Sequence, residues 1–239
     1  MPSIQWNKQT WDSEESWADG EDGWTFHADA CNQPYPAWKQ SVVDQFLAPY
    51  LGPDVDVLEL GPGHGRWSEY MVGHARSVCL VDVSERCINE CRHRFGDHPE
   101  VTFQVNDGRT LPVADRSVNL VWTFGTFVHI DPQDIQSYMG EVGRVLRPGG
   151  RFVIHHAGIS GWTRRKSLLM GFRSDMTAER FAEIVLQNHL VLDSQWRRWG
   201  ANDRFGLAYD DVITIGRSPR GHRRASSSTA LAFLHPGSG

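Results

Sequence analysis

The sequence predicts an α/β fold, with a seven-stranded, mostly parallel sheet, helices on both faces and a tryptophan-rich N-terminal arm. From residue 55 onward short apolar runs alternate with longer amphipathic stretches, which is the pattern of repeated strand–helix units. A chain of 239 residues with 40% hydrophobic and 22% charged residues suits one large globular domain. We therefore expect an arm at 1–35, a main domain at 36–216 and a disordered tail at 217–239.

The predicted elements alternate regularly along the main domain, and several helix ends carry explicit signals. Ser84 can cap the helix after the second strand, and Thr177 can begin the last helix. The Pro-Gly-Gly sequence at 148–150 ends the helix before it. We expect strands at 55–60, 77–82, 101–105, 118–124, 151–156, 191–197 and 210–216, and helices at 36–50, 64–74, 84–95, 133–146 and 177–188.

The first 30 residues are acidic and unusually rich in tryptophan. They carry seven acidic residues against one lysine, so the net charge of −5 belongs to this segment. Disordered tails avoid aromatic residues. The rings are therefore expected either to pack against the main domain or to form a lid that stacks on a polar ligand. As a lid, the arm and the helix after it would bring Trp24, Tyr35 and Trp38 to the substrate.

Composition excludes several classes of protein. No window approaches the roughly 18 uninterrupted apolar residues of a membrane span, and the N-terminus lacks the pattern of a secretory signal. We therefore expect a cytoplasmic protein with no membrane partner. Nucleic-acid binding needs an excess of lysine and arginine, which a net charge of −5 does not offer. The four cysteines form neither a disulfide framework nor a zinc motif, so we expect reduced thiols.

The stretch 57–67, VLELGPGHGRW, joins a buried strand to a glycine turn and then to a helix start. Gly61, Gly63 and Gly65 let the backbone approach a ligand closely, and a following helix offers N–H groups to a carboxylate or phosphate. The spacing is not the G-x-G-x-x-G of dinucleotide sites. Glu59 faces the turn, where it would repel a pyrophosphate but accept hydrogen bonds from an ammonium group.

From this turn to residue 156 the chain resembles the class I S-adenosylmethionine-dependent methyltransferases, whose sheet is Rossmann-like. The resemblance is closest to a bacterial branch linked to polysaccharide and natural-product tailoring. It implies that the glycine turn wraps the amino-acid end of S-adenosylmethionine, that Asp82 holds the ribose hydroxyls and that Asp107 reads the adenine amine. The implied cofactor residues are Glu59, Gly61, Gly63, Gly65, Asp82, Val83, Asn106, Asp107, Gly108 and Thr123.

Three histidines follow the strands that end nearest the expected methyl group. Methyl transfer is an in-line displacement, so the protein must position the acceptor and must remove a proton if the acceptor is a hydroxyl. His129, His155 and His156 are the candidate catalytic bases. Strand alternation sends His155 and His156 to opposite faces, so one of them should pack under a helix. A metal site using His129, Asp131 and one of the pair is an open alternative, but no contiguous ligand motif supports it and no metal is assigned.

The expected function is O-methylation of a sugar or of a polyhydroxylated or glycosylated small molecule, with S-adenosylmethionine as cofactor. Two alternatives stay open: N-methylation of a small-molecule amine, for which the acidic arm would supply counter-charge, and a non-catalytic cofactor-binding partner subunit. Methylation of nucleic acid is disfavoured by the acidic arm and by the lack of an Asn-Pro-Pro-Tyr type motif after the fourth strand. We expect a monomer or a homodimer.

Overall fold

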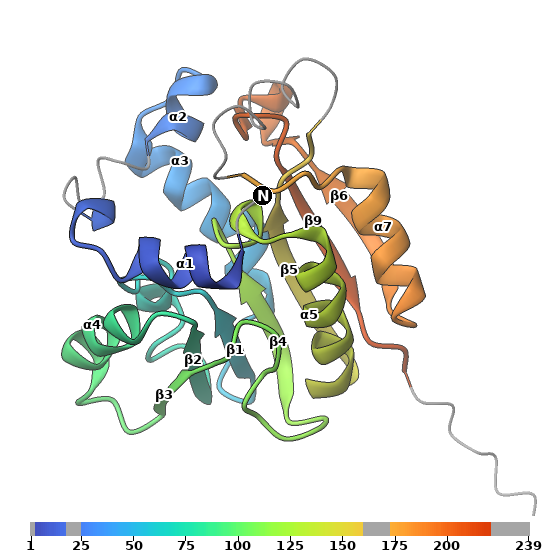
Figure 1. Cartoon of the computed structure of the whole chain (residues 1–239). Helices are drawn as coiled ribbons and strands as arrows, with labels where there is room; N and C mark the ends of the chain where they lie inside the picture. The colour runs from blue at the N-terminus through green and yellow to red at the C-terminus, as the bar shows by residue number, and fades with distance from the viewer. Residues whose placement is uncertain (1–2, 18–24, 160–172, 221–239) are drawn as a thin grey trace, which may run out of the picture.

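The computed structural model describes residues 3–17, 25–159 and 173–220. Seven strands of this part of the chain form one sheet in the order β3-β2-β1-β4-β5-β9-β6 (Figure 1). Neighbouring strands run parallel from β3 to β5, whereas β9 is antiparallel to both β5 and β6. The prediction of a seven-stranded, mostly parallel sheet is confirmed. The strands are β1 (Asp56–Leu60), β2 (Ser77–Asp82), β3 (Val101–Val105), β4 (Val118–Thr123), β5 (Leu146–His156), β6 (Val191–Trp196) and β9 (Val212–Arg217), and the short β7 (Arg198–Trp199) and β8 (Phe205–Gly206) pair separately.

Helices cover both faces of the sheet, because successive side chains of each strand point to opposite sides. Within β4, Val121 packs with α5 (Pro132–Val145) and α7 (Ala178–Gln187), while Leu120 and Trp122 pack on the opposite face. That second face is covered by α3 (Tyr35–Val42), its continuation η3 (Val43–Leu47) and α4 (Glu85–Phe95). The remaining helices are α1 (Ile4–Trp11), α2 (Phe26–Ala30) and the short turns η1 (Glu15–Trp17), η4 (Ala48–Tyr50), η5 (Ser68–Tyr70), η6 (Phe127–His129) and η7 (Ala201–Asp203).

The helix starts agree with the capping signals in the sequence. The Ser84 hydroxyl accepts the backbone N–H of Cys87 at 3.1 Å, and the Thr177 hydroxyl accepts that of Arg180 at the same distance. Each bond satisfies one of the donors that the first turn of a helix leaves without a partner. Both caps therefore fix where a helix leaves the sheet.

Two segments differ from the sequence prediction. The helix expected at 64–74 is reduced to the single turn η5, because glycines with φ of 82° and 76° at Gly65 and Gly73 interrupt the helical backbone on either side. Residues 146–150, expected as the end of the preceding helix and its Pro-Gly-Gly stop, already belong to β5, which extends its pairing with β4 back to Leu146.

The N-terminal arm lies across the carboxyl edge of the sheet. Helix α1 runs over the ends of β1 and β2 (Figure 1), and the Ser3 hydroxyl caps it by accepting the N–H of Trp6. Trp24 and the predicted tail from 221 onward lie outside the described residues. No helix in the described ranges combines the length and the apolar character that crossing a bilayer requires.

Candidate active site

A first cavity opens at the carboxyl ends of β1, β2 and β4, where an open parallel sheet binds its ligands. Its floor is the glycine turn after β1. Gly61 and Gly63 have φ of 71° and 57°, and neither has room for a side chain. A Cβ at Gly61 would collide with Thr126, and a Cβ at Gly63 would lie 2.6 Å from the ring of Trp17. The turn is therefore a cradle that only glycine can form.

Asp82 lies at the end of β2 beside this turn and lines the first cavity. Its carboxylate accepts the backbone N–H of Ser84 at 2.9 Å and that of Gly63 at 3.3 Å. Because the side chain is only 7% exposed, burial raises the pKa of Asp82 to about 6, against the hydrogen bonds that lower it. The backbone fixes the carboxylate in a position from which it can accept further donors in the cavity.

Half of the predicted cofactor residues line the first cavity, namely Gly61, Gly63, Asp82, Val83 and Gly108. Glu59 instead lies beneath the turn, 1% exposed, and accepts the hydroxyl of Ser68 at 2.5 Å. Burial raises the pKa of Glu59 to about 8. The structure thus does not bring Glu59 to the ligand surface, and Gly65 and Thr123 also lie outside the lining.

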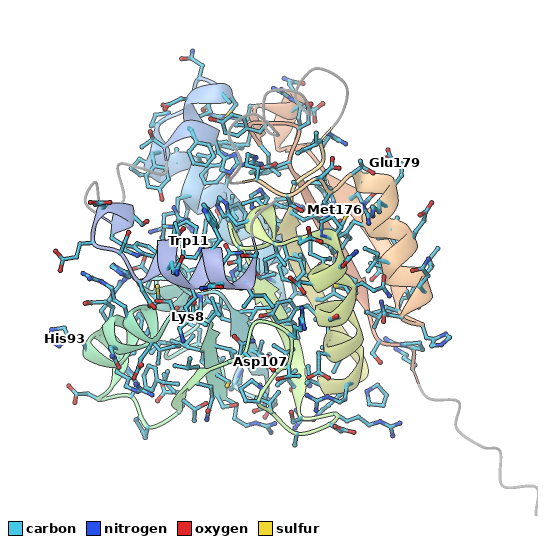
Figure 2. The ribbon with its side chains drawn as sticks, viewed as in Figure 1. Lys8, Trp11, His93, Asp107, Met176 and Glu179 are labelled. Atoms are coloured by element: carbon cyan, nitrogen blue, oxygen red, sulfur yellow. The ribbon has the colours of Figure 1, made fainter. Side chains whose placement is uncertain are left out.

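Asn106 and Asp107 also stay outside the first cavity. The exposed Asp107 carboxylate accepts the N–H groups of Arg109 and Thr110 at 2.8 and 2.7 Å, which closes an Asx turn. In Figure 2 Asp107 lies apart from Trp11 on α1. The side-chain amide of Asn106 donates to the Thr110 carbonyl and to the Tyr138 hydroxyl. The turn therefore uses the carboxylate of Asp107 and the amide N–H groups of Asn106, whereas Oδ1 of Asn106 has no partner among the described residues.

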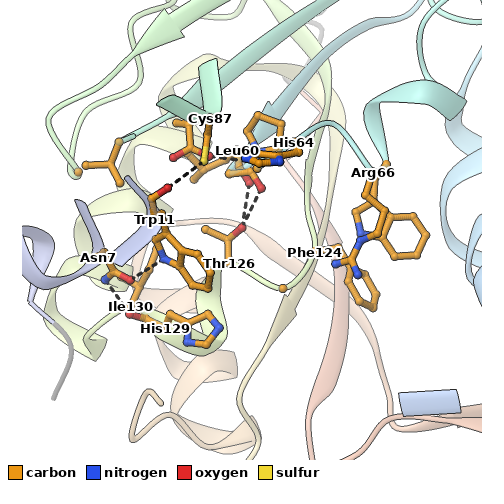
Figure 3. A pocket seen from close by; sticks show the side chains of 18 of the residues that line it. Asn7, Trp11, Leu60, His64, Arg66, Cys87, Phe124, Thr126, His129 and Ile130 are labelled. Atoms are coloured by element: carbon orange, nitrogen blue, oxygen red, sulfur yellow. Dashed lines mark hydrogen bonds between the residues drawn. The ribbon is translucent and has the colours of Figure 1, made fainter. Parts of the chain in front are cut away.

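One face of helix α1 closes the first cavity, and the adjacent face of the same helix borders a second cavity. Ile4, Asn7 and Trp11 line the first cavity at helical spacing, whereas Trp6 and Thr10 line the second. Figure 3 shows Asn7 and Trp11 beside His129 at this junction. The arm is thus a wall of both cavities, which agrees with the lid interpretation of its tryptophans.

Polar contacts fasten the arm to the main domain at both ends of α1. The Asn7 amide donates to the His129 carbonyl at 2.8 Å. At the other end of α1, Asp12 accepts the hydroxyl of Ser84 at 2.6 Å, beside the start of α4. A further contact is made by the Trp17 ring, which stacks on His64 with 3.8 Å between centroids. The arm is therefore held at both ends of the first cavity.

The second cavity, of about 440 Å³, adjoins the first. Aromatic rings, among them Trp6, Phe26, Trp38 and Tyr209, form much of its wall. Trp38 was expected to contact the substrate and lines this cavity, whereas Tyr35 does not and accepts a hydrogen bond from Arg66 instead. The residues that line both cavities are Trp11, Arg66, Phe124, Gly125 and His129. The two cavities therefore meet just beyond the end of β4.

The three candidate histidines occupy different places. His129 lines both cavities, and His155 lines the second. His156 points to the other face of β5, where its ring stacks on Phe181 and its nitrogens bond the Ala157 carbonyl and the Thr214 hydroxyl, each at 2.7 Å. The assignment of His156 as a catalytic residue is therefore corrected: it is a satisfied core histidine, as strand alternation requires of one member of the pair.

Backbone donors fix the tautomers of two histidines in the second cavity. The Gly125 N–H points at Nδ1 of His155 at 3.0 Å, and the Ala208 N–H points at Nδ1 of His27 at 2.9 Å. A ring nitrogen that accepts a hydrogen bond carries no proton, so in both neutral rings the proton is on Nε2. Burial holds the pKa of both histidines well below the usual range. Both rings are consequently hydrogen-bond donors rather than bases.

His27, His155 and the buried Asp211 bring their ligand atoms within 4.8 Å of one another, which is close enough for a metal site. A neutral imidazole that ligates through Nε2 must carry its proton on Nδ1. Here both Nδ1 atoms face backbone N–H groups, and Arg173 forms an ion pair with Asp211. The donor set therefore does not match a divalent cation.

The sequence analysis missed His27, Arg173 and Asp211. His27 lies in α2, Arg173 lies in the segment before α7, and Asp211 lies directly before β9. No local motif connects these three positions. His27 lies in the predicted arm and Asp211 in the strand predicted at 210–216, and no motif singled out either residue. Only the folded chain brings them to His155.

Comparison with known proteins identifies the domain to which the first cavity belongs. Residues 57–150 match a protein family described as a methyltransferase domain. These residues belong to the class I S-adenosylmethionine-dependent methyltransferases. The cofactor of this methyltransferase domain is S-adenosylmethionine, and the glycine cradle with Asp82 fits it.

The names of individual relatives of the methyltransferase domain give different acceptor atoms, carbon in one and nitrogen in another. A probable S-adenosylmethionine-dependent methyltransferase of Mycolicibacterium smegmatis is 34% identical over 99 residues, which are 41% of this chain and 37% of that protein. The ubiquinone/menaquinone biosynthesis C-methyltransferase of Rubrivivax gelatinosus is 32% identical over 129 residues, 54% of this chain and 48% of that protein. The chain thus spans less than half the length of these curated relatives.

Among solved structures, the geranyl diphosphate C-methyltransferase from Streptomyces coelicolor shares the fold with a TM-score of 0.66 and 14% identity. The match covers 91% of this chain and 98% of that one. That structure was solved with Mg²⁺, geranyl diphosphate and S-adenosylhomocysteine. At this identity the match supports the fold of the methyltransferase domain and leaves the acceptor open.

Proposed function

We propose that the chain transfers a methyl group from S-adenosylmethionine to a hydroxyl oxygen of a small neutral acceptor bound in the second cavity. The observation that carries the proposal is the junction of the two cavities, where His129 lines both. A group bound in the first cavity and a molecule bound in the second meet at this point. Holding two reactants in contact accounts for much of the acceleration of a displacement reaction.

The first cavity receives the cofactor through the residues that line it. The turn at Gly61 and Gly63 allows close backbone approach, and the carboxylate of Asp82 accepts hydroxyl donors. When bound, the cofactor supplies an activated methyl group. The arm residues Ile4, Asn7 and Trp11 close the cavity from the other side and exclude water.

The charges around the second cavity favour a neutral acceptor over a cationic amine. Asp211 is the acid that lines this cavity in the described part of the chain, and Arg173 already neutralises it. No acid in the described part of the arm lines this cavity, where Asp12 bonds Ser84 and Glu14 bonds Arg86. Among the described lining residues, an amine that arrives as a cation would therefore meet only a carboxylate that Arg173 already pairs.

A hydroxyl acceptor has to lose its proton, and His129 is the residue placed to take it. His155 and His27 are held as Nε2–H donors by backbone N–H groups, so neither offers a lone pair to the cavity. His129 lies at the junction, on the turn η6 that follows β4. We assign it the role of general base, which accepts the hydroxyl proton on a ring nitrogen.

A mass-spectrometric screen tests the proposal. The protein and S-adenosylmethionine are incubated with neutral polyhydroxylated molecules, sugars, phenols, amines and prenyl compounds, and products are sought with a mass gain of one CH₂ unit. The expected result is a gain on a hydroxylated acceptor, lost in Asp82→Ala. Methylation of amines alone, or of carbon alone, would refute the hydroxyl assignment, and no gain in any class would contradict the proposal as a whole.

A further inference from the structure

A buried polar cluster lies in the wall of the second cavity, and the proposed reaction does not use it. It consists of His27, His155, Arg173 and Asp211, each less than a tenth exposed. The four residues line the second cavity but not the first, so the cluster stands apart from the junction where His129 lies. Polar groups are rarely buried in such number without a function.

Several atoms of the polar cluster lack a hydrogen-bond partner. Nε2 of His155 lies 3.3 Å from Oδ2 of Asp211, but the two do not align as a hydrogen bond. Within the described residues neither atom has a partner, and the same is true of Nε of Arg173. The three atoms are themselves buried, and the side chains that carry them line the cavity. Their unmet hydrogen bonds describe the group that would satisfy them.

That group must both donate and accept hydrogen bonds. The Nε2–H of His155 and the Nε–H of Arg173 require an acceptor, whereas Oδ2 of Asp211 requires a donor. A carboxylate or phosphate would be repelled by Asp211 and could not donate to it. An ammonium group could not accept from the N–H groups and would meet the charge of Arg173. A neutral hydroxyl satisfies both requirements.

We propose that the polar cluster binds a second hydroxyl of the acceptor, distinct from the hydroxyl that is methylated. The inference rests on the proposed function and narrows it, because it makes the substrate a molecule with at least two hydroxyl groups. One hydroxyl lies at the junction beside His129, and the other is held by Asp211 and His155. The aromatic walls around Trp6 and Phe26 contact the apolar body between them.

Three compounds that share a cyclohexane ring test the binding step without methyl transfer. Cyclohexanol, cyclohexanecarboxylate and cyclohexylammonium are titrated into the wild-type protein saturated with S-adenosylhomocysteine, with ¹⁵N-labelled histidine side chains observed by NMR. The expected result is that cyclohexanol shifts the Nε2–H signals of His155 and His27 and binds at least tenfold tighter than either ion. The His156 signal is the internal control, because its two hydrogen bonds lie outside the cavity.

A matched variant locates the effect. Asp211→Asn keeps the size of the side chain and removes its charge, and it should weaken cyclohexanol binding about tenfold. If this variant fails to fold, the relative affinities of the three compounds for the wild-type protein still test the proposal. Preferential binding of either ion, no response to cyclohexanol, or loss of the His155 Nε2 proton on adding Zn²⁺ would each overturn the proposal. Because no methyl group is transferred, these outcomes are independent of the acceptor screen.

Discussion

The side-chain amide of Asn7 donates a hydrogen bond of 2.8 Å to the backbone carbonyl of His129, 122 residues away in the sequence. The contact joins the N-terminal arm to the turn that carries the candidate base. Because the carbonyl oxygen is buried with this bond, the position of α1 and the position of His129 depend on one another. The arm is therefore part of the wall of the candidate active site.

Substitution at Asn7 should lower turnover, because its hydrogen bond holds the turn that carries His129. Asn7→Asp still accepts the Trp11 indole N–H, which Asn7 accepts at 3.2 Å, but it places a carboxylate against the His129 carbonyl. We expect kcat to fall about tenfold or more, by the usual size of a lost buried hydrogen bond, about 1–3 kcal/mol. Ser3→Ala is the control, since it removes the cap of α1 without touching His129. Equal kcat in the two variants would show that Asn7 does not position the turn.

Cofactor affinity should depend on the ionisation of Asp82. Burial raises the pKa of this carboxyl to about 6 in the free protein. Only the ionised form accepts two hydroxyl donors, so affinity for S-adenosylmethionine should increase as pH rises through about 6. Calorimetry at pH 5 to 8 measures this rise, which should be absent in Asp82→Asn. Asp82→Ala should lose roughly 2–3 kcal/mol of binding free energy, by the size of charge-assisted hydrogen bonds.

Asp107 provides the matched comparison for Asp82. The family resemblance gives both acids to the cofactor, but Asp107 is exposed and spends its carboxylate on the N–H groups of Arg109 and Thr110. We expect Asp107→Ala to change cofactor affinity less than threefold. A loss as large as that of Asp82→Ala would show that the loop rearranges to contact the cofactor.

Glu59 should make the folded protein less stable as pH rises. Its folded pKa of about 8 lies above the ordinary value of 4.5, so the protonated carboxyl contributes stability below pH 4.5 that is lost as pH rises toward 8. Glu59→Gln removes this titration. Between pH 5 and 8 the variant should lose roughly 3 kcal/mol less unfolding free energy than the wild type, by the value of a pKa unit. Denaturant unfolding at each pH measures this difference. If the unfolding free energies of the wild type and of Glu59→Gln changed with pH by the same amount, the raised pKa of Glu59 would be contradicted.

Deletion of residues 1–17 should impair the binding of both the cofactor and the acceptor. The arm lines the first cavity through Ile4, Asn7 and Trp11 and the second through Trp6 and Thr10. The truncated protein, which keeps α2 and His27, should lose turnover and bind S-adenosylmethionine at least tenfold more weakly, since water enters the site. Normal turnover by a soluble truncated protein would exclude the lid interpretation.

The sequence predicted the fold well because its signals are local. Strands such as β1 and β2 are apolar runs, and Ser84 caps its helix through a neighbour three residues away. The glycine turn is a local signal too, whereas Asp82 was assigned to the cofactor by the family resemblance. A turn that consumes the carboxylate of Asp107 was also local, but the family resemblance assigned that residue to adenine instead.

The second cavity could not be predicted in the same way. His27, Arg173 and Asp211 are single polar residues without a periodic pattern, and their meeting depends on how the arm and the segment before β9 pack on β5. Alternation along β5 showed that His155 and His156 face opposite ways, but the side that carries the cavity depends on tertiary packing. Tautomers likewise depend on distant donors, as the Gly125 N–H at His155 illustrates.

The most direct test of the account follows the methyl group itself. The wild-type protein and His129→Ala are incubated with an acceptor from the screen and S-adenosylmethionine labelled with ¹³C in its methyl group, and NMR identifies the atom that receives the label. We predict an O-methyl product, formed about a hundredfold more slowly by His129→Ala with nearly unchanged cofactor affinity. Label on nitrogen or carbon, or an equal rate in the two proteins, would contradict hydroxyl methylation with His129 as the base.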